Sequence, residues 1–156
     1  MFFGQSSFAT YALTNESNTI KVDKDLPIEL LGPLGCGIQT GAGSIMKALA
    51  CEEGSSIAIY GGGSVGLSAV MGAVVQKCST IILVEPMESR RQLALSLGAT
   101  HVIDPILSDT QSSIREICPL GVNYGFDSTG VSSVIETAIA TLAPRGELGL
   151  VGTSSQ

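Results

Sequence analysis

The fold of this chain is decided by the stretch IAIYGGGSVG at residues 57–66. Its apolar first half is typical of a buried strand, and an apolar segment typical of a helix follows at residues 67–75. Between them, Gly61, Gly63 and Gly66 have the spacing G-x-G-x-x-G. In that pattern the first glycine allows a sharp turn, the second lets a pyrophosphate approach the backbone, and the third lets the helix pack close to the sheet. The stretch therefore predicts a dinucleotide held at a helix N-terminus.

An acidic residue, Glu85, lies about 20 residues beyond the last of these glycines, at the end of a second apolar run over residues 80–84. By itself, Glu85 would be interpreted as a solvated residue at a strand end. At this spacing its carboxylate can accept hydrogen bonds from the adenosine ribose hydroxyls, and it would repel a 2′-phosphate. Arg90 and Arg91 follow closely and weaken that repulsion. The pattern predicts NAD rather than NADP as the cofactor.

The composition fits one domain with a sizeable core. The chain has 156 residues, of which 44% are apolar, and its mean hydropathy is +0.39. A formal net charge of −6 argues against a surface that follows nucleic-acid phosphates. The longest mostly apolar stretch, residues 65–75, is too short to cross a bilayer, and no export leader is evident at the N-terminus. We therefore expect a cytoplasmic protein whose partners are neither nucleic acids nor membranes.

The chain contains four cysteines and one histidine, and their spacing gives no familiar metal-binding set. The sequence has no Cys-x-x-Cys pair, and three of the cysteines are predicted to be small buried apolar residues. His101 is interpreted as a structural residue at the start of a strand. The cysteines are Cys36, Cys51, Cys78 and Cys118.

Strand-like and helix-like segments alternate from Ala58 onward, which predicts right-handed βαβ units and a mainly parallel sheet in a doubly wound α/β fold. Strands are expected near residues 56–61, 80–85, 101–103, 123–127 and 147–151, and helices near residues 64–77, 88–97 and 131–142. In the last helix, apolar residues recur on one face at helical spacing. Ser133 and Glu136 predict a capping box at its start, and Pro144 with Gly146 predicts its end.

The first part of the chain has a different pattern. Residues 8–13 and 20–22 are strand-like, with a turn expected between them at residues 15–18. A glycine-rich stretch at residues 32–37 then leads into a helix expected around residues 44–50. These segments do not belong to the βαβ series.

Two segments taken together, GCGIQTGAG at residues 35–43 and the glycine stretch at residues 57–66, resemble the zinc-dependent medium-chain alcohol dehydrogenases. Within that family the chain looks like the aryl-alcohol (benzyl alcohol) dehydrogenases. LGATHVI at residues 97–103 and FDSTG at residues 126–130 extend the resemblance, which covers essentially the whole chain. It implies a Rossmann-type sheet, NAD as the cofactor and a catalytic zinc in the full-length parent.

The resemblance also implies roles for individual residues. Cys36 would be a thiolate ligand of the zinc, and Thr40 the catalytic residue beside the nicotinamide and the reacting alcohol carbon. Glu85 and Arg90 would flank the adenosine ribose. The residues that would face the pyrophosphate and the nicotinamide are Gly61, Gly63, Ser64, Val65 and Gly66. The remaining cofactor positions would be Thr129 at the adenine end, with Val151 and Thr153 at the nicotinamide carboxamide.

Several of these roles have a plain structural alternative that stays open. Cys36 by itself would be interpreted as a buried small residue, and Arg90 as a solvated residue on a helix face. The alternative for Thr129, Val151 and Thr153 is simple packing in the sheet.

Members of the resembled family are far longer than this chain. Residues 1–31 look like the end of a GroES-like catalytic β domain, and residues 32–156 like a NAD-binding Rossmann domain that lacks its last strand. In the family, the preceding domain supplies the other zinc ligands and most of the substrate walls, so we expect the isolated chain to be inactive. The sheet edge left by the absent strand predicts pairing with another copy, and a homo-oligomer is expected.

The function expected from this resemblance is hydride transfer between an alcohol, aromatic in kind, and NAD, assisted by zinc. Its substrates would be small-molecule alcohols and aldehydes. One alternative is a zinc-free quinone reductase that uses NADPH, against which Cys36 and Glu85 both count. A non-catalytic NAD-binding module is a second alternative. A methyl-donor enzyme also uses glycines and an acidic strand end, but it would not require residues 36–40, and we rank it last.

Overall fold

The structure is a computed structural model that describes residues 10–152. The chain divides into two compact units, Met1–Gly32 and Pro33–Gln156, and each is described by itself. In the described part of the first unit, the complete regular elements are two short 3₁₀ turns, η1 (Glu16–Asn18) and η2 (Ile28–Leu30). A third 3₁₀ turn, η3 (Gly32–Gly35), spans the boundary between the units.

The strands predicted at residues 8–13 and 20–22 are wrong where the structure describes them, and residues 8 and 9 lie outside the described range. The turn predicted at residues 15–18 is confirmed by η1. A strand needs a paired neighbour and a buried face, whereas Tyr11 and Ile20 are 90% and 86% exposed. The apolar residues of these two segments suggested strands, but where the structure describes them they remain exposed and form none.

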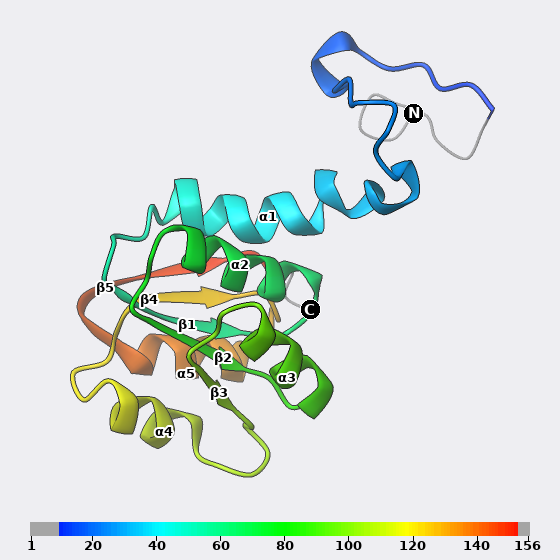
Figure 1. The fold of residues 1–156 in the computed structure, drawn as a ribbon. Helices are drawn as coiled ribbons and strands as arrows, with labels where there is room; N and C mark the ends of the chain where they lie inside the picture. Colours follow the sequence, from blue (N-terminus) through cyan, green and yellow to red (C-terminus); the bar gives the residue numbers. More distant parts are fainter. Residues whose placement is uncertain (1–9, 153–156) are drawn as a thin grey trace. The chain divides into compact units, whose positions relative to one another are not determined.

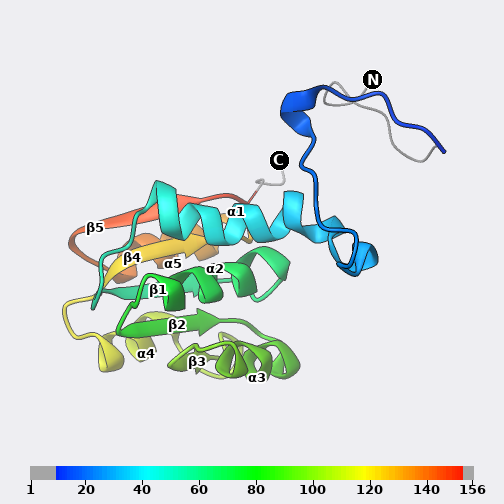
Figure 2. The same cartoon turned by 45° about the horizontal axis from the view of Figure 1, so that its top comes forward.

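The second unit contains a parallel sheet of five strands in the order β3-β2-β1-β4-β5, with helices on both faces (Figure 1 and Figure 2). The strands are β1 (Ser56–Tyr60), β2 (Thr80–Val84), β3 (His101–Ile103), β4 (Val122–Asp127) and β5 (Leu142–Leu150). The helices are α1 (Gly37–Gly43), which continues into the π-helical turn η4 (Ser44–Ala48), α2 (Ser64–Val75), α3 (Glu88–Ser96), α4 (Thr110–Ile117) and α5 (Ser132–Thr141). The predicted Rossmann-type, doubly wound fold is confirmed.

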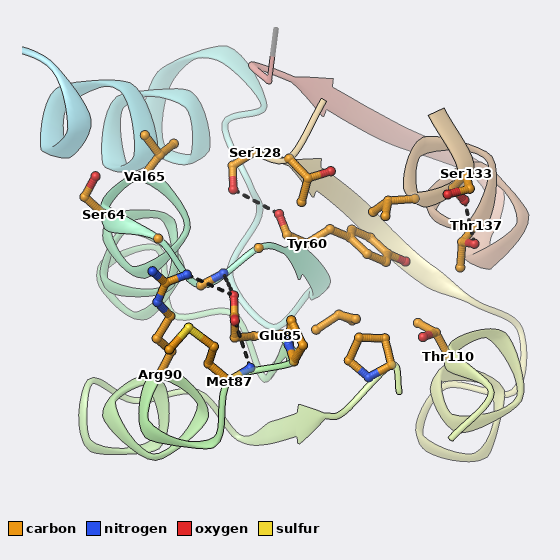
Figure 3. Close-up of a pocket in the computed structure, with 18 residues that line it drawn as sticks. Tyr60, Ser64, Val65, Glu85, Met87, Arg90, Thr110, Ser128, Ser133 and Thr137 are labelled. Atoms are coloured by element: carbon orange, nitrogen blue, oxygen red, sulfur yellow. Dashed lines mark hydrogen bonds and ion pairs between the residues drawn. The ribbon is translucent and has the colours of Figure 1, made fainter. Parts of the chain in front are cut away.

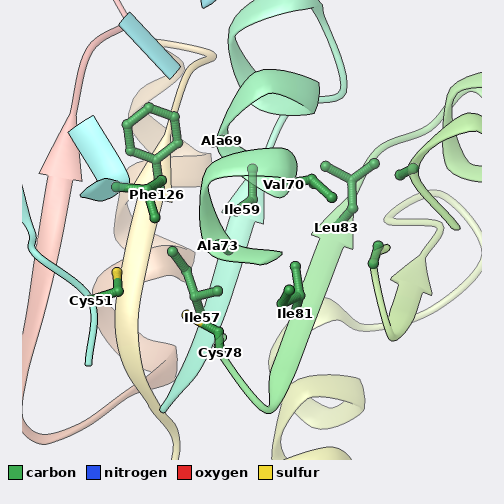
Figure 4. Close-up of a cluster of buried hydrophobic side chains, with 13 residues drawn as sticks. Cys51, Ile57, Ile59, Ala69, Val70, Ala73, Cys78, Ile81, Leu83 and Phe126 are labelled. Atoms are coloured by element: carbon green, nitrogen blue, oxygen red, sulfur yellow. The ribbon is translucent and has the colours of Figure 1, made fainter. Parts of the chain in front are cut away.

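The central strand β1 is buried on both faces, and its alternate residues serve two apolar cores. Ile57 and Ile59 pack on one face with residues of α2 and neighbouring strands (Figure 4). Ala58 and Tyr60 pack on the other face with residues of α4 and α5. A strand covered on both sides must be apolar throughout, which is why β1 and β2 are continuous apolar runs in the sequence.

The helix predicted at residues 131–142 is observed as α5, but its two ends differ from the prediction. The helix begins one residue before Ser133 and has no side-chain cap, so the capping box of Ser133 and Glu136 is wrong. Pro144 and Gly146 lie inside β5 instead of ending the helix. The strand tolerates them because its pairing with β4 is irregular at that point.

Two further helices depart from the sequence pattern. The pattern does not predict α4, which begins after Asp109, where the carboxylate accepts a hydrogen bond from the N–H of Ser112 at 2.8 Å. The helix expected around residues 44–50 starts earlier, at Gly37. Its glycines suggest a loop, but they permit close helix packing, since a Cβ at Gly41 would overlap the backbone of α2.

The Tyr60 hydroxyl forms a buried hydrogen bond, 2.6 Å from the hydroxyl oxygen of Thr141. Thr141 donates its own proton to the carbonyl oxygen of Ala138 at 2.8 Å, so Tyr60 is the donor of the pair. Burial raises the pKa of Tyr60 to about 12. We expect Tyr60→Phe to lower the free energy of unfolding by about 1 kcal/mol, measured by urea denaturation. Tyr11→Phe, at an exposed position, is the control, and equal midpoints for both variants would contradict the assignment.

Candidate functional site

A cavity of about 740 Å³ lies at the carboxyl ends of the parallel strands (Figure 3). The segments that follow β1, β2, β3 and β4 all contribute to its wall. The strand order reverses beside β1, because the chain runs outward to β2 and β3 and then returns to β4 on the other side. In open α/β sheets, ligands bind at such a switch point. The predicted site residues that line the cavity are Gly61, Gly63, Ser64, Val65, Glu85, Arg90 and Thr129.

The three glycines of the loop after β1 meet three different steric demands. Gly61 has a φ of +94°, and a Cβ there would come within 2.8 Å of the Ser128 hydroxyl oxygen. At Gly66, a Cβ would overlap the carbonyl oxygen of Gly61. At Gly63, by contrast, a Cβ would meet nothing within 4 Å. The protein itself therefore requires the first and third glycines, whereas the second leaves space over the backbone that a ligand can occupy.

Two backbone N–H groups hold the Glu85 carboxylate in place. Its Oε2 accepts from the N–H of Gly62 at 2.6 Å, and its Oε1 accepts from the N–H of Met87 at 2.9 Å. A Cβ at Gly62 would lie 2.8 Å from Cγ of Glu85, so this approach also requires glycine. The G-x-G-x-x-G pattern treats Gly62 as a variable position, and sequence reasoning missed its role. Its only signal was the unbroken run of three glycines.

The two arginines after Glu85 have different surroundings. Arg90 places its Nη1 3.8 Å from Oε2 of Glu85, and its side chain is 46% exposed at the cavity. Arg91 instead forms an ion pair with Asp104 at 3.0 Å and donates hydrogen bonds to the carbonyl oxygens of Glu85 and Pro86. Arg91 therefore ties together the segments after β2 and β3, and Arg90 is the arginine that faces the cavity.

A buried carboxylate shapes the loop after β4. Asp127 is 0% exposed; its Oδ1 accepts from the N–H and the hydroxyl of Thr129 at 3.1 and 2.7 Å, and its Oδ2 from the N–H of Gly130 at 2.9 Å. Ser128 donates its hydroxyl proton to the carbonyl oxygen of Tyr60 at 3.0 Å, which fixes the loop against β1. Sequence reasoning gave Asp127 no role, although it has the same signal as Glu85, an acid ending an apolar strand.

The cavity fits a dinucleotide in its donors and acceptors. Helix α2 begins behind Gly63 with no side chain capping it, so its first N–H groups remain for a ligand. Those groups and the positive end of the helix dipole suit a pyrophosphate. The Glu85 carboxylate oxygens have acceptor capacity beyond their two backbone bonds, which suits ribose hydroxyls.

Four predicted site residues in the described range do not line this cavity. Gly66 is buried in the first turn of α2. Cys36 precedes α1, and Thr40 lies within α1 beside a second, more open hollow formed by α1 and η4. Val151 donates its N–H to the carbonyl oxygen at the end of β4 at 3.0 Å. The fifth, Thr153, lies outside the described residues.

Cys36 is exposed, so its interpretation as a buried small residue is wrong. Cys51 and Cys78 are buried and Cys118 is half-buried. Within residues 10–152, no group of three or more side chains that could hold a metal is found. A catalytic zinc uses three protein ligands. The described residues therefore do not by themselves fit the zinc that the resemblance implies. His101 begins β3, as predicted.

The sequence profile of the zinc-binding dehydrogenase family matches residues 64–156, and the chain belongs to that family. The geraniol dehydrogenase of Castellaniella defragrans is 50% identical over 153 residues, which are 97% of this chain and 41% of that protein. The crystal structure of benzyl alcohol dehydrogenase from Acinetobacter calcoaceticus matches with 51% identity and a TM-score of 0.93, over 97% of this chain and 42% of that one. An alcohol dehydrogenase zinc-binding domain protein from Burkholderia ambifaria matches with 53% identity and a TM-score of 0.93, over 98% and 41%.

These relatives confirm the resemblance drawn from the sequence, at the level of the family. The chain spans about two fifths of the length of the relatives it matches. Among the helices of the described range, none has the length and apolar character that crossing a membrane requires.

Proposed function

We propose that the cavity binds NAD and that this chain is the nucleotide-binding part of an alcohol dehydrogenase. The observation that carries the proposal is the position of Glu85, a carboxylate held by two N–H groups at the cavity beside the uncapped start of α2. Such a carboxylate accepts hydrogen bonds from the ribose hydroxyls and repels a 2′-phosphate. Arg90 is paired with Glu85, so the positive charge of Arg90 is already partly compensated.

In this proposal, different residues of the cavity bind different parts of the cofactor. The N–H groups of Ser64 and Val65, at the uncapped start of α2, would bind the pyrophosphate, for which the backbone of Gly63 leaves space. Glu85 and Arg90 hold the adenosine ribose. The adenine end would lie by Thr129 and the nicotinamide by Val65. Val151 and Thr153 stay predicted contacts of the nicotinamide carboxamide.

The proposed reaction is oxidation of an alcohol to an aldehyde. When bound, NAD would supply the hydride acceptor. The chain's own residues would bind the cofactor and fix the position of its ribose, and Thr40 would be the residue beside the reacting alcohol carbon. The names of the relatives support an alcohol as the substrate, since two of them are dehydrogenases of geraniol and benzyl alcohol. We propose that the substrate is an aromatic alcohol.

Calorimetric titration with NAD and with NADP tests the proposed cofactor. We expect saturable binding of NAD and weaker binding of NADP. Glu85→Gln keeps the shape and one acceptor oxygen but removes the charge, so it should weaken NAD binding about 10-fold, the loss of roughly 1.5 kcal/mol from a charge-assisted hydrogen bond. The same change should weaken NADP less.

The matched control is Glu88→Gln, which removes the same charge from an exposed position in the first turn of α3. It should leave both affinities unchanged. Equal binding of NAD and NADP by the unmodified chain, or equal effects of the two substitutions, would contradict the ribose role of Glu85.

We further propose that residues 1–31 belong to a catalytic GroES-like domain and residues 32–156 to the NAD-binding domain, with Cys36 as one of three zinc ligands in the longer protein.

Because one thiolate cannot replace three ligands, we expect this chain alone to produce no NADH from benzyl alcohol, NAD and added zinc. The measurement is NADH absorbance over time. Zinc-dependent turnover by the purified chain would contradict it. Homo-oligomeric assembly and a cytoplasmic location stay predictions from the sequence.

A further inference from the structure

A second pair of opposite charges lies close to Glu85 but does not face the cavity. Nη2 of Arg91 is 3.0 Å from Oδ2 of Asp104, and the two side chains are only 12% and 17% exposed. Neither residue lines the cavity, whereas Arg90 does. An ion pair that is largely shielded from water is screened less than a surface pair and holds its geometry better. The proposed cofactor contacts do not include this pair.

Arg91 holds the backbone that carries the Glu85 side chain. Its Nη1 donates hydrogen bonds to the carbonyl oxygens of Glu85 and Pro86, at 2.8 and 2.6 Å. The N–H of Glu85 is held as well, since it donates to the carbonyl oxygen of Ile103 at 3.0 Å. Both polar groups of the Glu85 backbone are thus bonded, which fixes the direction in which its side chain leaves the backbone.

Asp104 in turn holds the guanidinium of Arg91. Its Oδ2 faces Arg91 in the ion pair, and its Oδ1 accepts a hydrogen bond from the N–H of Ile106 at 2.9 Å. Because the guanidinium is planar and rigid, a contact that fixes one of its nitrogens also orients the others. The turn after β3 therefore determines where Arg91 meets the backbone of Glu85.

The pairing of strands β2 and β3 ends just before this point, at Val84 and Ile103. Beyond it, the two segments are joined by the N–H of Glu85 and by the ion pair. Loss of the ion pair should therefore leave the sheet intact and loosen the segment that carries Glu85.

We propose that Arg91 and Asp104 are positioning residues for NAD, which act through Glu85 without touching the cofactor. The inference rests on the proposed function, since it requires that Glu85 binds the ribose. A carboxylate that is already held in its binding position loses less conformational freedom when the ribose arrives, so the affinity is higher. An effect of charge alone would be different, because Arg91 would attract the anionic cofactor and Asp104 would repel it.

Calorimetric titration with NAD tests the inference on two neutralising variants, Arg91→Gln and Asp104→Asn. They remove charges of opposite sign, so an effect of charge alone would change the affinity in opposite directions. Positioning predicts that each variant weakens NAD binding about 5-fold. Asp104→Asn is decisive by itself if Arg91→Gln does not fold, because only positioning predicts weaker binding from it.

The matched control is Arg115→Gln. Arg115 is also partly buried, and its guanidinium donates to three backbone carbonyl oxygens, none in a residue that lines the cavity. The control removes the same charge and the same kind of hydrogen bond, and it should leave the affinity for NAD unchanged.

A double-mutant cycle shows whether the effect passes through Glu85. Glu85→Gln should weaken NAD binding about 10-fold in the unmodified chain, but only about 3-fold when Arg91→Gln is already present. The reason is that a carboxylate that is no longer held in place has less affinity to lose.

Amide hydrogen exchange of the ligand-free chain measures the same positioning without a cofactor. The N–H groups of Gly62 and Met87 donate to the Glu85 carboxylate. Both should exchange about 5-fold faster in Arg91→Gln and at an unchanged rate in Arg115→Gln.

Opposite changes in affinity for Arg91→Gln and Asp104→Asn, or equal effects of Arg91→Gln and Arg115→Gln, would overturn the inference. A full effect of Glu85→Gln in both backgrounds, or unchanged exchange at Gly62 and Met87, would overturn it as well. If the unmodified chain bound no NAD, the proposed function would fail, whereas the exchange rates would still decide whether the ion pair holds Glu85.

Discussion

Gly66→Val should lower the free energy of unfolding by about 3 kcal/mol and abolish cofactor binding. The new Cβ would overlap the carbonyl oxygen of Gly61, and it would also lie 2.9 Å from the Gly61 carbonyl carbon. Both obstacles are backbone atoms, so no side-chain rotation can relieve them. The helix would have to move away from β1, which would open the core against which α2 packs. Urea denaturation followed by circular dichroism measures the loss.

Gly63→Ala is the matched control for this prediction, because a Cβ there meets nothing within 4 Å. We expect this variant to fold with unchanged stability but to bind NAD more weakly, since the methyl group would occupy the space left for the pyrophosphate. The two variants separate two requirements that the sequence pattern marks with the same residue, glycine: close packing within the protein at Gly66 and space for the ligand at Gly63. If both variants lost the same stability, the steric account of the loop would be wrong.

Asp127→Ala should cost about 3 kcal/mol of stability, the second of the two largest effects. The substitution removes a buried acceptor of three hydrogen bonds and leaves the N–H groups of Thr129 and Gly130 without it. The loop after β4 would lose its shape, and that loop forms one wall of the cavity. Thermal and urea unfolding measure the effect on stability, and NAD titration measures the effect on the cavity.

The control for this substitution is Asp109→Ala, which removes an exposed carboxylate that caps α4 with one backbone hydrogen bond. It should cost about 1 kcal/mol. The difference between the two variants reports the burial and the number of hydrogen bonds of Asp127. Losses of equal size would show that Asp127 contributes no more than a surface cap.

The central sheet could be predicted because its signals are local and strong. Strands β1 and β2 are buried on both faces, so they appear as unbroken apolar runs, and the glycines after β1 mark the turn into α2. Glu85 could be placed because the distance along one βαβ unit is set by the geometry of a helix and two strands. Each of these inferences depends on residues that are near one another in the sequence.

The remaining features depend on contacts that a pattern does not contain. Gly62 is required because Glu85 approaches it from the end of another strand. Arg91 differs from Arg90 because it forms an ion pair with Asp104, which comes from the segment after β3. Likewise, residues 20–22 resemble a strand, but within the described residues they form none, and Ile20 is 86% exposed. In each case the deciding partner comes from a distant segment, or is missing from the described part of the chain.

An NMR titration of the ¹⁵N-labelled chain locates the binding site of NAD. We predict that NAD shifts the amide signals of Gly62, Gly63, Val65 and Met87 most strongly, since these groups border the pyrophosphate and ribose positions of the cavity. NADP at the same concentration should shift them less. Shifts confined to residues 35–48, or no shifts at saturating NAD, would contradict the proposed site.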